Sequence, residues 1–440
     1  MSFSYNLSMA LRSIRRSLGM SVLMIVSVGF GVAAAMTTLA VFKAVSGDPI
    51  PWKSSKLFVP QIDFWGPRAA QSNKGEPPAG LDYTDAAALW RDHRATAQSP
   101  MYQIVPWVMR NDGGDVPISV VGHAVVNEFF PMLDLPFVAG SAWSAEDDAR
   151  GAAVAVISRR LSEKLFGRQD AVGRLINISG KTYQIKGVLG QWHPQPRYYD
   201  LFNTGGFTTA QDELFIPFQR AIDVGMSNIG SLACRTNPSG RAIKDLMGSN
   251  CAWISYMVQL DTRAAMQRFD EYLNNYASQQ RAIGRFDWAP NNRLRDLPAW
   301  LDYRKVVPRE TMISMVVAFG LLLACLASTA GLLLSQFLRR RSEIGIRRAL
   351  GAPRKAIYGQ FLTEAGVIGC AGGVLGLGLT FTSLAGLPYI LPEGVAALVH
   401  LNPSLTLGTL VLAIVSTLAA AFYPITLVSR TATSWQIDAI

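Results

Sequence analysis

The sequence predicts a membrane protein in which four transmembrane helices carry a large α+β domain outside the membrane. Half of the 440 residues are hydrophobic and only 16% are charged, and this composition is too apolar for an ordinary soluble protein. Four uncharged runs are longer than the ~18 residues that mark a membrane-spanning helix. These runs are Ser21–Phe42, Thr311–Leu338, Ala365–Pro392 and Ser404–Ser429. The long stretch between the first two runs mixes charged, polar and apolar residues, and it supplies the outer domain.

An amphipathic segment precedes the first span. Apolar residues recur at helical spacing over Asn6–Leu18, and Arg12, Arg15 and Arg16 lie largely off this stripe. We therefore expect a helix that lies in the membrane interface. A cleaved signal peptide is the alternative, because Ala33–Ala35 resembles a cleavage site. The apolar run continues well past that site, and this length favours the membrane helix.

Basic residues indicate the topology of the four spans. They lie before the first span, after the fourth, and between the second and third, where Arg339–Gln360 carries seven Lys and Arg residues. The positive-inside rule therefore places the N-terminus, this stretch and the C-terminus in the cytoplasm, and the outer domain on the other side of the membrane. The charges of the outer domain are nearly balanced although the whole chain has a net charge of +10, so no nucleic-acid partner is expected.

Short strands and helices alternate in the outer domain, as in an α+β fold. Helices are expected over Tyr83–Arg94, capped by Asp82 or Thr84, and over Thr262–Ala282. A third helix is expected over Ser158–Phe166. The expected strands are Leu57–Trp65, Pro117–Val126, Ala153–Ile157, Trp253–Leu260 and the two arms of a hairpin, Arg174–Ile178 and Lys181–Leu189. Gln191–Asn250 is rich in Gly, Pro and Asn and gives no assignable pattern.

Two of the four cysteines, Cys234 and Cys251, lie in the outer domain, whereas Cys325 and Cys370 lie in spans. An even pair in an oxidising compartment predicts a disulfide. It would close a loop of about 16 residues and add ~3 kcal/mol through the entropy of the unfolded chain. Two free thiols are the alternative.

The third span contains a group of glycines. Gly369, Gly372, Gly373 and Gly376 form two overlapping G-x-x-x-G spacings. Such spacing lets helix backbones approach closely. Helix packing inside one chain and a seam between two subunits are both consistent with it.

Glu364 stands directly before the third apolar run. A carboxylate at this depth is costly unless it is paired or close to water. We expect the region of Arg354 and Lys355 to satisfy it, and a role in coupling is the alternative.

The sequence contains no recognisable catalytic or metal site. Gly180-Lys181-Thr182 resembles the end of a phosphate-binding loop, but Leu175 stands where that loop needs a glycine. The histidines show no metal-ligand spacing, and we expect them to be surface or hydrogen-bonded residues. They are His93, His123, His193 and His400. We therefore expect no catalytic residue, metal or cofactor on this chain, and a separate chain to bind ATP if ATP is the energy source.

The basic stretch Arg339–Gln360 also contains residues that are typical of helix ends and helix starts. Gly351 can end a helix in the αL conformation, and Pro353 suits the first turn of the next helix. The pair Glu343 and Arg347 adds at most ~0.5 kcal/mol to a helix. Topology or a bound partner therefore explains the charges better than helix stability does, and our interpretation is a docking surface for an ATPase.

This stretch resembles the cytoplasmic loop of MacB-like and FtsX-like permeases, a four-span family of ABC-type mechanotransmission proteins. The matching signature is E-I-G-x-x-R-A-x-G-A. The segments at Ala10–Ala35, Asn127–Gly140 and Val156–Ile176 are similar to other parts of the same family. The residues to which the resemblance assigns ATPase coupling are Glu343, Ile344, Gly345, Arg347, Arg348, Ala349, Leu350, Gly351, Ala352 and Pro353.

The resemblance also implies a domain order. It predicts an elbow helix with the first span over residues 1–43, a periplasmic MacB-like core domain over 44–308, and an FtsX-like permease domain with the other three spans over 309–440. Within the core domain, residues 44–95 and 251–308 would form a porter-like part, and residues 96–250 a Sabre-like insertion.

The function implied is that of a non-catalytic permease subunit in a Gram-negative inner membrane. Such a subunit pairs with a second permease subunit, identical or different, and with a cytoplasmic ATPase whose movements it passes to the periplasm. MacB itself has a fused ATPase domain, which we do not recognise in this sequence. Export of a peptide, antibiotic or siderophore with a periplasmic adaptor and an outer-membrane channel is the first interpretation. Lipoprotein release and a non-transporting scaffold that regulates cell-wall hydrolases are the alternatives.

Overall fold

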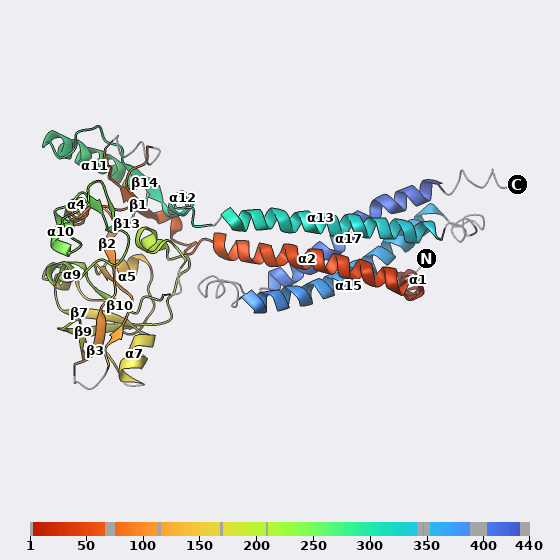
Figure 1. The fold of residues 1–440 in the computed structure, drawn as a ribbon, viewed down its shortest axis with the longest axis horizontal. Helices are drawn as coiled ribbons and strands as arrows, with labels where there is room; N and C mark the ends of the chain where they lie inside the picture. The colour runs from red at the N-terminus through yellow and green to blue at the C-terminus, as the bar shows by residue number, and fades with distance from the viewer. Residues whose placement is uncertain are drawn as a thin grey trace. The chain divides into compact units, whose positions relative to one another are not determined.

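The chain folds into two compact units, which are Met1–Ser46 with Val307–Ile440, and Gly47–Val306. We call them the membrane unit and the outer unit. A computed structural model describes residues 3–66, 75–111, 116–167, 170–207, 210–307, 309–340, 346, 353–387 and 403–431. Figure 1 shows the fold of both units.

The described part of the membrane unit has four helices that are long and apolar enough to cross a membrane. The four predicted spans are therefore confirmed as helices. One boundary differs, because α15 begins at Arg354 rather than at Ala365 and runs through the buried Glu364. The four are α2 (Leu18–Ser46), α13 (Arg309–Leu338), α15 (Arg354–Gly386) and α17 (Pro403–Thr431). The shorter helix α1 (Phe3–Arg16) precedes them.

The glycines of α15 pack against other helices of the same chain. Gly372 and Gly376 face α2, and Gly369 and Gly373 face α17. A Cβ atom at residue 372 would lie only 2.9 Å from Val28 Cγ1, so a side chain there would force α2 and α15 apart. The four glycines therefore serve packing inside the membrane unit, where α2, α15 and α17 run side by side (Figure 1).

A twelve-stranded mixed sheet forms the centre of the outer unit. Its order is β14-β1-β13-β2-β5-β10-β7-β9-β8-β3-β4, with β6 paired to β9. Two neighbouring pairs, β5 with β10 and β7 with β9, are parallel. The strands are β1 (Leu57–Gln61), β2 (Ala97–Ile104), β3 (Trp107–Arg110), β4 (Ile118–Ser119), β5 (Gly122–Val125), β6 (Phe137–Gly140), β7 (Val154–Ser158), β8 (Leu175–Ile178), β9 (Lys181–Leu189), β10 (Leu214–Pro217), β13 (Ser255–Gln259) and β14 (Arg293–Asp296).

Strand β2 connects the two parts of this sheet. Its first half, Ala97–Met101, pairs with β13, and its second half, Tyr102–Ile104, pairs with β5. On one side of β2, the early strand β1 pairs with the late strands β13 and β14. The sheet thus brings the two chain segments predicted as porter-like side by side, while the porter and Sabre division itself stays a prediction.

The predicted helices of the outer unit are present with their caps. The side chain of Asp82, not Thr84, caps α4 by accepting from the backbone N–H of Asp85, and Thr262 caps α11 in the same way from Ala265. The helices are α4 (Tyr83–Asp92), α5 (Phe129–Met132), α6 (Ala145–Ala149), α7 (Arg159–Phe166), α8 (Leu201–Thr204), α9 (Phe218–Asp223), α10 (Ile243–Met247), α11 (Arg263–Ala282) and α12 (Leu297–Tyr303), with short 3₁₀ turns η1 (Ser54–Lys56) and η2 (Tyr198–Asp200).

The segment Gln191–Asn250, unassigned from sequence, contributes a central strand. The four-residue run Leu214–Pro217 is β10, which is buried throughout between β5 and β7. Elsewhere the predicted strand Leu57–Trp65 is too long, since β1 ends at Gln61. The predicted hairpin is correct, with β8 and β9 paired from Leu175 to Ile178.

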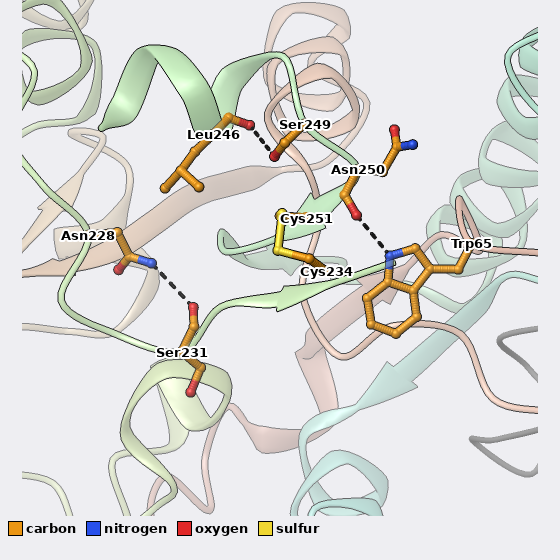
Figure 2. Close-up of a disulfide and its surroundings, with 8 residues drawn as sticks. All are labelled: Trp65, Asn228, Ser231, Cys234, Leu246, Ser249, Asn250 and Cys251. Carbon is orange, nitrogen blue, oxygen red and sulfur yellow. Dashed lines mark hydrogen bonds between the residues drawn. A yellow bond between two sulfur atoms is a disulfide. The ribbon is translucent and has the colours of Figure 1, made fainter. Parts of the chain in front are cut away.

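A disulfide joins Cys234 to Cys251 in the structure. The two cysteines lie directly opposite each other in the small sheet β11 (Ala233–Cys234) and β12 (Cys251–Ala252). Figure 2 shows that the indole of Trp65 points at the neighbouring carbonyl of Asn250, to which its Nε1 donates at 3.1 Å. The bridge closes the loop that contains α10. Cys325 and Cys370 are free.

Candidate functional site

Most of the residues to which the sequence assigned ATPase coupling lie outside the described residues. These are Glu343, Ile344, Gly345, Arg347, Arg348, Ala349, Leu350, Gly351 and Ala352. Pro353 is described, and it occupies the N-cap position of α15. Ile346 is also described, and its side chain is 62% exposed. The structure therefore defines the two helix ends on either side of this stretch, the end of α13 and the start of α15.

A cluster of polar side chains lies between α1, the end of α13 and the part of α15 that begins ten residues after its start. Its centre is Glu364 of α15, which has no exposed surface. Glu364 Oε1 accepts from Ser13 Oγ of α1 and from Gln336 Nε2 of α13, the latter at 2.8 Å. Glu364 Oε2 lies 3.4 Å from Arg340 Nη1, and Gln336 Nε2 also donates to Ser17 Oγ at 3.1 Å. We call these five residues the Glu364 cluster.

Local sequence explains how the cluster assembles. Gln336 and Arg340 are four residues apart, so they project from the same side of the chain at the end of α13. An apolar layer encloses them, in which the rings of Phe337 and Phe361 are 4.1 Å apart between centroids. A charge inside an apolar membrane unit is costly unless it is paired. The Glu364 cluster supplies that pairing from three separate helices.

The cation beside Glu364 among the described side chains differs from the expected one. The region of Arg354 and Lys355 was expected to satisfy it, whereas among the described side chains the cation beside it is Arg340, at the start of the basic stretch, and not Lys355. The side chain of Arg354 lies outside the described residues. Sequence reasoning missed Ser13, Gln336 and Arg340. The available signal was that polar residues interrupt the helical faces at the ends of apolar runs, but no sequence pattern assigns such residues to one another.

A second buried polar group lies in the outer unit, around His123 of β5. His123 Nε2 lies 2.8 Å from Asp200 Oδ2, and its Nδ1 lies 3.2 Å from Asp212 Oδ1. Arg197 Nη1 approaches the same Asp212 oxygen at 3.4 Å, and the hydroxyl of Ser255 on β13 donates to Asp200. All of these side chains are buried, so this group joins β5, η2 and β13 internally rather than offering a site to a substrate.

The charges of this second group shift the pKa of its members. Burial alone would lower the pKa of His123, but the charge of Asp212 and hydrogen bonds to Asp200 and Asp212 raise it to about 9. Burial alone would raise the pKa of Asp212, but His123 and Arg197 hold it below its ordinary value. The imidazole is therefore cationic at neutral pH. Among the described residues no group of three or more His, Cys, Asp and Glu side chains could hold a metal ion.

Comparison with known sequence families defines the class of protein. Residues 21–276 match the MacB-like periplasmic core domain, and residues 315–433 match the FtsX-like permease C-terminal domain. Four membrane-spanning helices with a periplasmic α+β domain are thus the architecture of an ABC transporter permease. The protein belongs to the MacB-like family of these permeases, as the basic stretch predicted.

Curated relatives are exporters with joined ATP-binding and permease parts. The chain is 26% identical over 374 residues to the macrolide export ATP-binding/permease protein MacB of Azoarcus sp. (strain BH72), covering 84% of this chain and 50% of that protein. It is 28% identical over 253 residues to the pyoverdine export ATP-binding/permease protein PvdT of Pseudomonas entomophila (strain L48), covering 57% of this chain and 33% of that protein. The chain therefore spans half or less of the length of these relatives.

Solved structures also show similarity to the chain. The periplasmic region of MacB from Actinobacillus actinomycetemcomitans has a TM-score of 0.36 and 10% identity, covering 57% of this chain and 94% of that region. The extracellular domain of the noncanonic ABC-type transporter YknZ from Gram-positive bacteria has a TM-score of 0.34 and 12% identity, covering 54% of this chain and 99% of that domain.

Proposed function

We propose that this chain is the permease subunit of an ABC-type mechanotransmission complex in a Gram-negative inner membrane. In this complex a separate ATPase chain hydrolyses ATP in the cytoplasm, and the permease passes the resulting movement to its periplasmic domain. The observation that carries the proposal is the combination, in one chain, of a MacB-like periplasmic core domain and an FtsX-like permease domain.

The proposed ATPase contact is the basic stretch Arg339–Gln360. It carries seven Lys and Arg residues, and the positive-inside rule favours the cytoplasm for it. Ile346, the one described residue between Arg340 and Pro353, has a side chain that is 62% exposed. The Glu364 cluster lies beside both ends of this stretch, where it can transmit a displacement of the stretch to three helices.

The proposed complex contains a second permease subunit. The described face of α13 that other helices leave uncovered has small residues at one-turn intervals, which favour close helix approach in membranes. A Cβ atom at Gly320 or Gly331 would meet nothing within 4 Å, and Ala324 and Ser328 between them are exposed. This face is the proposed seam, since the glycines of α15 are already covered by α2 and α17.

The proposed cargo is a peptide, antibiotic or siderophore handled on the periplasmic side. Support comes from the names of the relatives, one a macrolide exporter and the other a pyoverdine exporter. A periplasmic adaptor and an outer-membrane channel would complete the export path. A lipoprotein chaperone or a cell-wall hydrolase activator among the bound proteins would instead indicate the alternative functions.

Affinity purification tests the proposal directly. The tagged chain is isolated from its native host in mild detergent, and the bound proteins are identified by mass spectrometry. We expect an ABC ATPase to co-purify and to hydrolyse MgATP, together with a periplasmic adaptor. A preparation that carries no ATPase at stoichiometric level would contradict the proposed function.

A further inference from the structure

We propose that Glu364 is a positioning residue that fixes α1 and the end of α13 to α15 just beyond the ATPase-contact stretch, so that the three elements move together during the ATP cycle. This inference rests on the proposed function. It starts from the position of Glu364, which lies on α15 and contacts α1 through Ser13 and the end of α13 through Gln336 and Arg340.

The two carboxylate oxygens of Glu364 hold different parts of the chain. Oε1 accepts from Ser13 and from Gln336, and thereby joins α1 to the body of α13. Oε2 lies 3.4 Å from Arg340 Nη1, and Arg340 stands two residues beyond Leu338, where α13 ends. One side chain therefore holds a helix and also the chain segment that leads into the contact stretch.

Gln336 adds a second connection, to the residue between α1 and α2. Its Nε2 donates to Ser17 Oγ at 3.1 Å and lies 3.5 Å from Ser13 Oγ. Ser17 directly follows Arg16, where α1 ends, so the chain is held at Ser13 within α1 and again at Ser17, just before α2 begins. A displacement of α13 is in this way passed to α1, and α1 is the helix predicted to lie in the membrane interface.

Apolar packing alone already joins these helices. Phe337 and Phe361 are in ring contact, and Leu333 and Ala365 are buried beside them. A buried ion pair seldom stabilises a fold more than apolar side chains of the same volume would. Charge-assisted hydrogen bonds do fix direction and distance, so the Glu364 cluster is better suited to setting geometry than to holding the unit together.

The Glu364 cluster also has an unfilled acceptor. Gln336 Oε1 is buried and receives no hydrogen bond from the described residues. A buried acceptor without a donor is costly, so an arrangement that brings a donor to this oxygen is favoured. This acceptor is open to a donor from outside the cluster, and such a donor would take nothing from the bonds that join the three elements.

The test uses the full chain co-purified with its ATPase and placed in lipid nanodiscs. The variants are Glu364→Gln, Arg340→Gln and the neutral double variant with both substitutions. The matched control is Leu362→Ala, two residues from Glu364 on the partly exposed face of α15. Two spin labels, at Arg16→Cys and Arg339→Cys, report the separation of α1 from the end of α13, since both positions are exposed. Cys325 and Cys370 are replaced by Ser in all samples.

We expect Glu364→Gln to reach the membrane and bind the ATPase while kcat for MgATP changes about fivefold and KM changes less than about twofold, because the nucleotide site is on another chain. The spin-label distance should stay narrow in the wild type with and without vanadate-trapped nucleotide, and it should broaden in Glu364→Gln. The double variant should restore protein yield, since no uncompensated charge remains, but it should restore neither kcat nor the narrow distance. Leu362→Ala should match the wild type.

Three outcomes would overturn the proposal. The first is wild-type kcat and wild-type spin-label distances in Glu364→Gln. The second is recovery of both kcat and the narrow spin-label distance in the double variant. The loss in Glu364→Gln would then come only from leaving Arg340 without a countercharge. The third is failure of both variants to accumulate, which would make the cluster a requirement for folding. Absence of an ATPase from the wild-type preparation is a different result, and it would contradict the proposed function instead.

Discussion

His123 Nδ1 lies 3.2 Å from Asp212 Oδ1 in the interior of the outer unit, with its side chain inaccessible to solvent. The other imidazole nitrogen lies 2.8 Å from Asp200 Oδ2, so one ring bridges two carboxylates. Arg197 is the second cation beside Asp212, and the hydroxyl of Tyr199 donates to the same carboxylate. The charges balance only when His123 carries a proton.

Stability of the outer unit should therefore fall between pH 6.5 and pH 9. The pKa of His123 is raised from 6.5 to about 9 in the folded protein, so its contribution is complete below pH 6.5 and is lost as the pH rises through 9. The pKa of Asp212 is lowered, so its contribution is present above the ordinary Asp range and is lost only in strong acid. A shift of this size corresponds to about 3 kcal/mol. Thermal unfolding followed by tryptophan fluorescence checks this, because all ten tryptophans except Trp435 lie in Gly47–Val306.

His123→Asn is the matched variant for this pH dependence. It keeps a polar side chain but cannot carry charge, so two buried carboxylates would share only Arg197. We expect lower stability at pH 6 and a flatter profile between pH 6.5 and 9. His93, whose side chain is 47% exposed, is the control position, and His93→Asn should leave the profile unchanged. An equally steep decline in His123→Asn would contradict the assignment.

Arg285 should be a stability determinant of the outer unit. Its guanidinium joins the N-terminus of α4 to the chain that follows α11, with Nη2 2.6 Å from Asp82 Oδ2 and Nη1 paired with Asp85. Burial and Asp85 raise the pKa of Asp82 to about 7 although Arg285 opposes the shift. Arg285→Ala would leave two neighbouring buried carboxylates without a cation. Since Arg285 is 24% exposed, we expect a loss of about 2–4 kcal/mol.

Tyr276→Phe separates the charge effect of Arg285 from simple hydrogen bonding. It removes one hydrogen bond to Asp85, 2.7 Å long, and should cost about 1 kcal/mol. Arg281→Ala, at an exposed position near the end of α11, is the control for loss of positive charge and should be nearly neutral. Unfolding followed by tryptophan fluorescence measures all three. Equal losses for Arg285→Ala and Arg281→Ala would mean that the ion pairs contribute nothing.

Reduction of the disulfide should destabilise the outer unit. Cys234 and Cys251 are 17 residues apart, and a bridge over such a loop contributes about 3 kcal/mol. For a unit of this size the melting temperature should fall by about 6–10 °C. Cys234→Ser and dithiothreitol should have equal, non-additive effects, whereas Cys370→Ser should have none. Alkylation of the native chain without reductant should modify only the cysteines of the spans, and modification of Cys234 would contradict the bridge.

Glycines of α15 and α13 should respond differently to substitution. Gly372→Ala places a Cβ atom 2.9 Å from Val28 Cγ1 and 3.0 Å from Val28 Cβ, so we expect a less stable membrane unit. Val28→Ala removes only the first of these two contacts and should compensate in part. Gly378→Ala meets nothing within 4 Å and should be neutral or slightly stabilising. Gly320→Leu should leave the fold intact and weaken the proposed subunit pairing. The temperature at which Cys325 becomes reactive to a thiol-reactive dye measures the stability of the membrane unit. Light scattering measures the mass of the permease assembly, and thus the subunit pairing. Loss of subunit pairing in Gly372→Ala without loss of stability would contradict this assignment, because it would place the subunit seam at the glycines of α15.

Sequence patterns predicted correctly those helices and strands that depend on neighbouring residues in the chain. Apolar runs gave the four spans, Asp82 and Thr262 marked helix starts, and the Ser179-Gly180 turn marked the β8–β9 hairpin. Strand β10 was not predicted, because four residues are too few to show a hydrophobic period and its neighbours β5 and β7 are far away in sequence. Its place in the sheet is decided by burial between them.

The two polar groups show the same limit. Asp200 and Asp212 meet His123 across intervals of more than 70 residues, and nothing near His123 in the sequence indicates two carboxylates. Glu364 was recognised as an acid that needs a partner, but among the described side chains its cation is Arg340 and not the nearer Lys355. Arg340 and Gln336 reach it because α13 and α15 meet beside α1. Such pairings depend on tertiary packing, which single-sequence patterns do not encode.

Glu343→Lys should separate ATP hydrolysis from export. The family signature places Glu343 at the start of the proposed contact helix Ser342–Leu350, where it is the only acid of Arg339–Gln360. Reversing its charge adds to an already basic surface, so a complementary ATPase surface should lose a contact and gain repulsion. Membrane insertion depends on the apolar spans and the positive-inside pattern, which this change leaves intact.

The measurement compares ATPase bound per permease and export per ATP hydrolysed in membranes from the native host. For Glu343→Lys we expect normal chain levels with export reduced about tenfold or more. Gly351→Leu should give a similar loss, because the sequence predicts an αL helix cap at Gly351, and that conformation strongly disfavours a branched side chain. Glu271→Lys, the same change at an exposed position of α11, is the control and should behave as the wild type. Wild-type export by both variants would show that the ATPase binds the permease elsewhere. The basic stretch would then only determine the membrane topology.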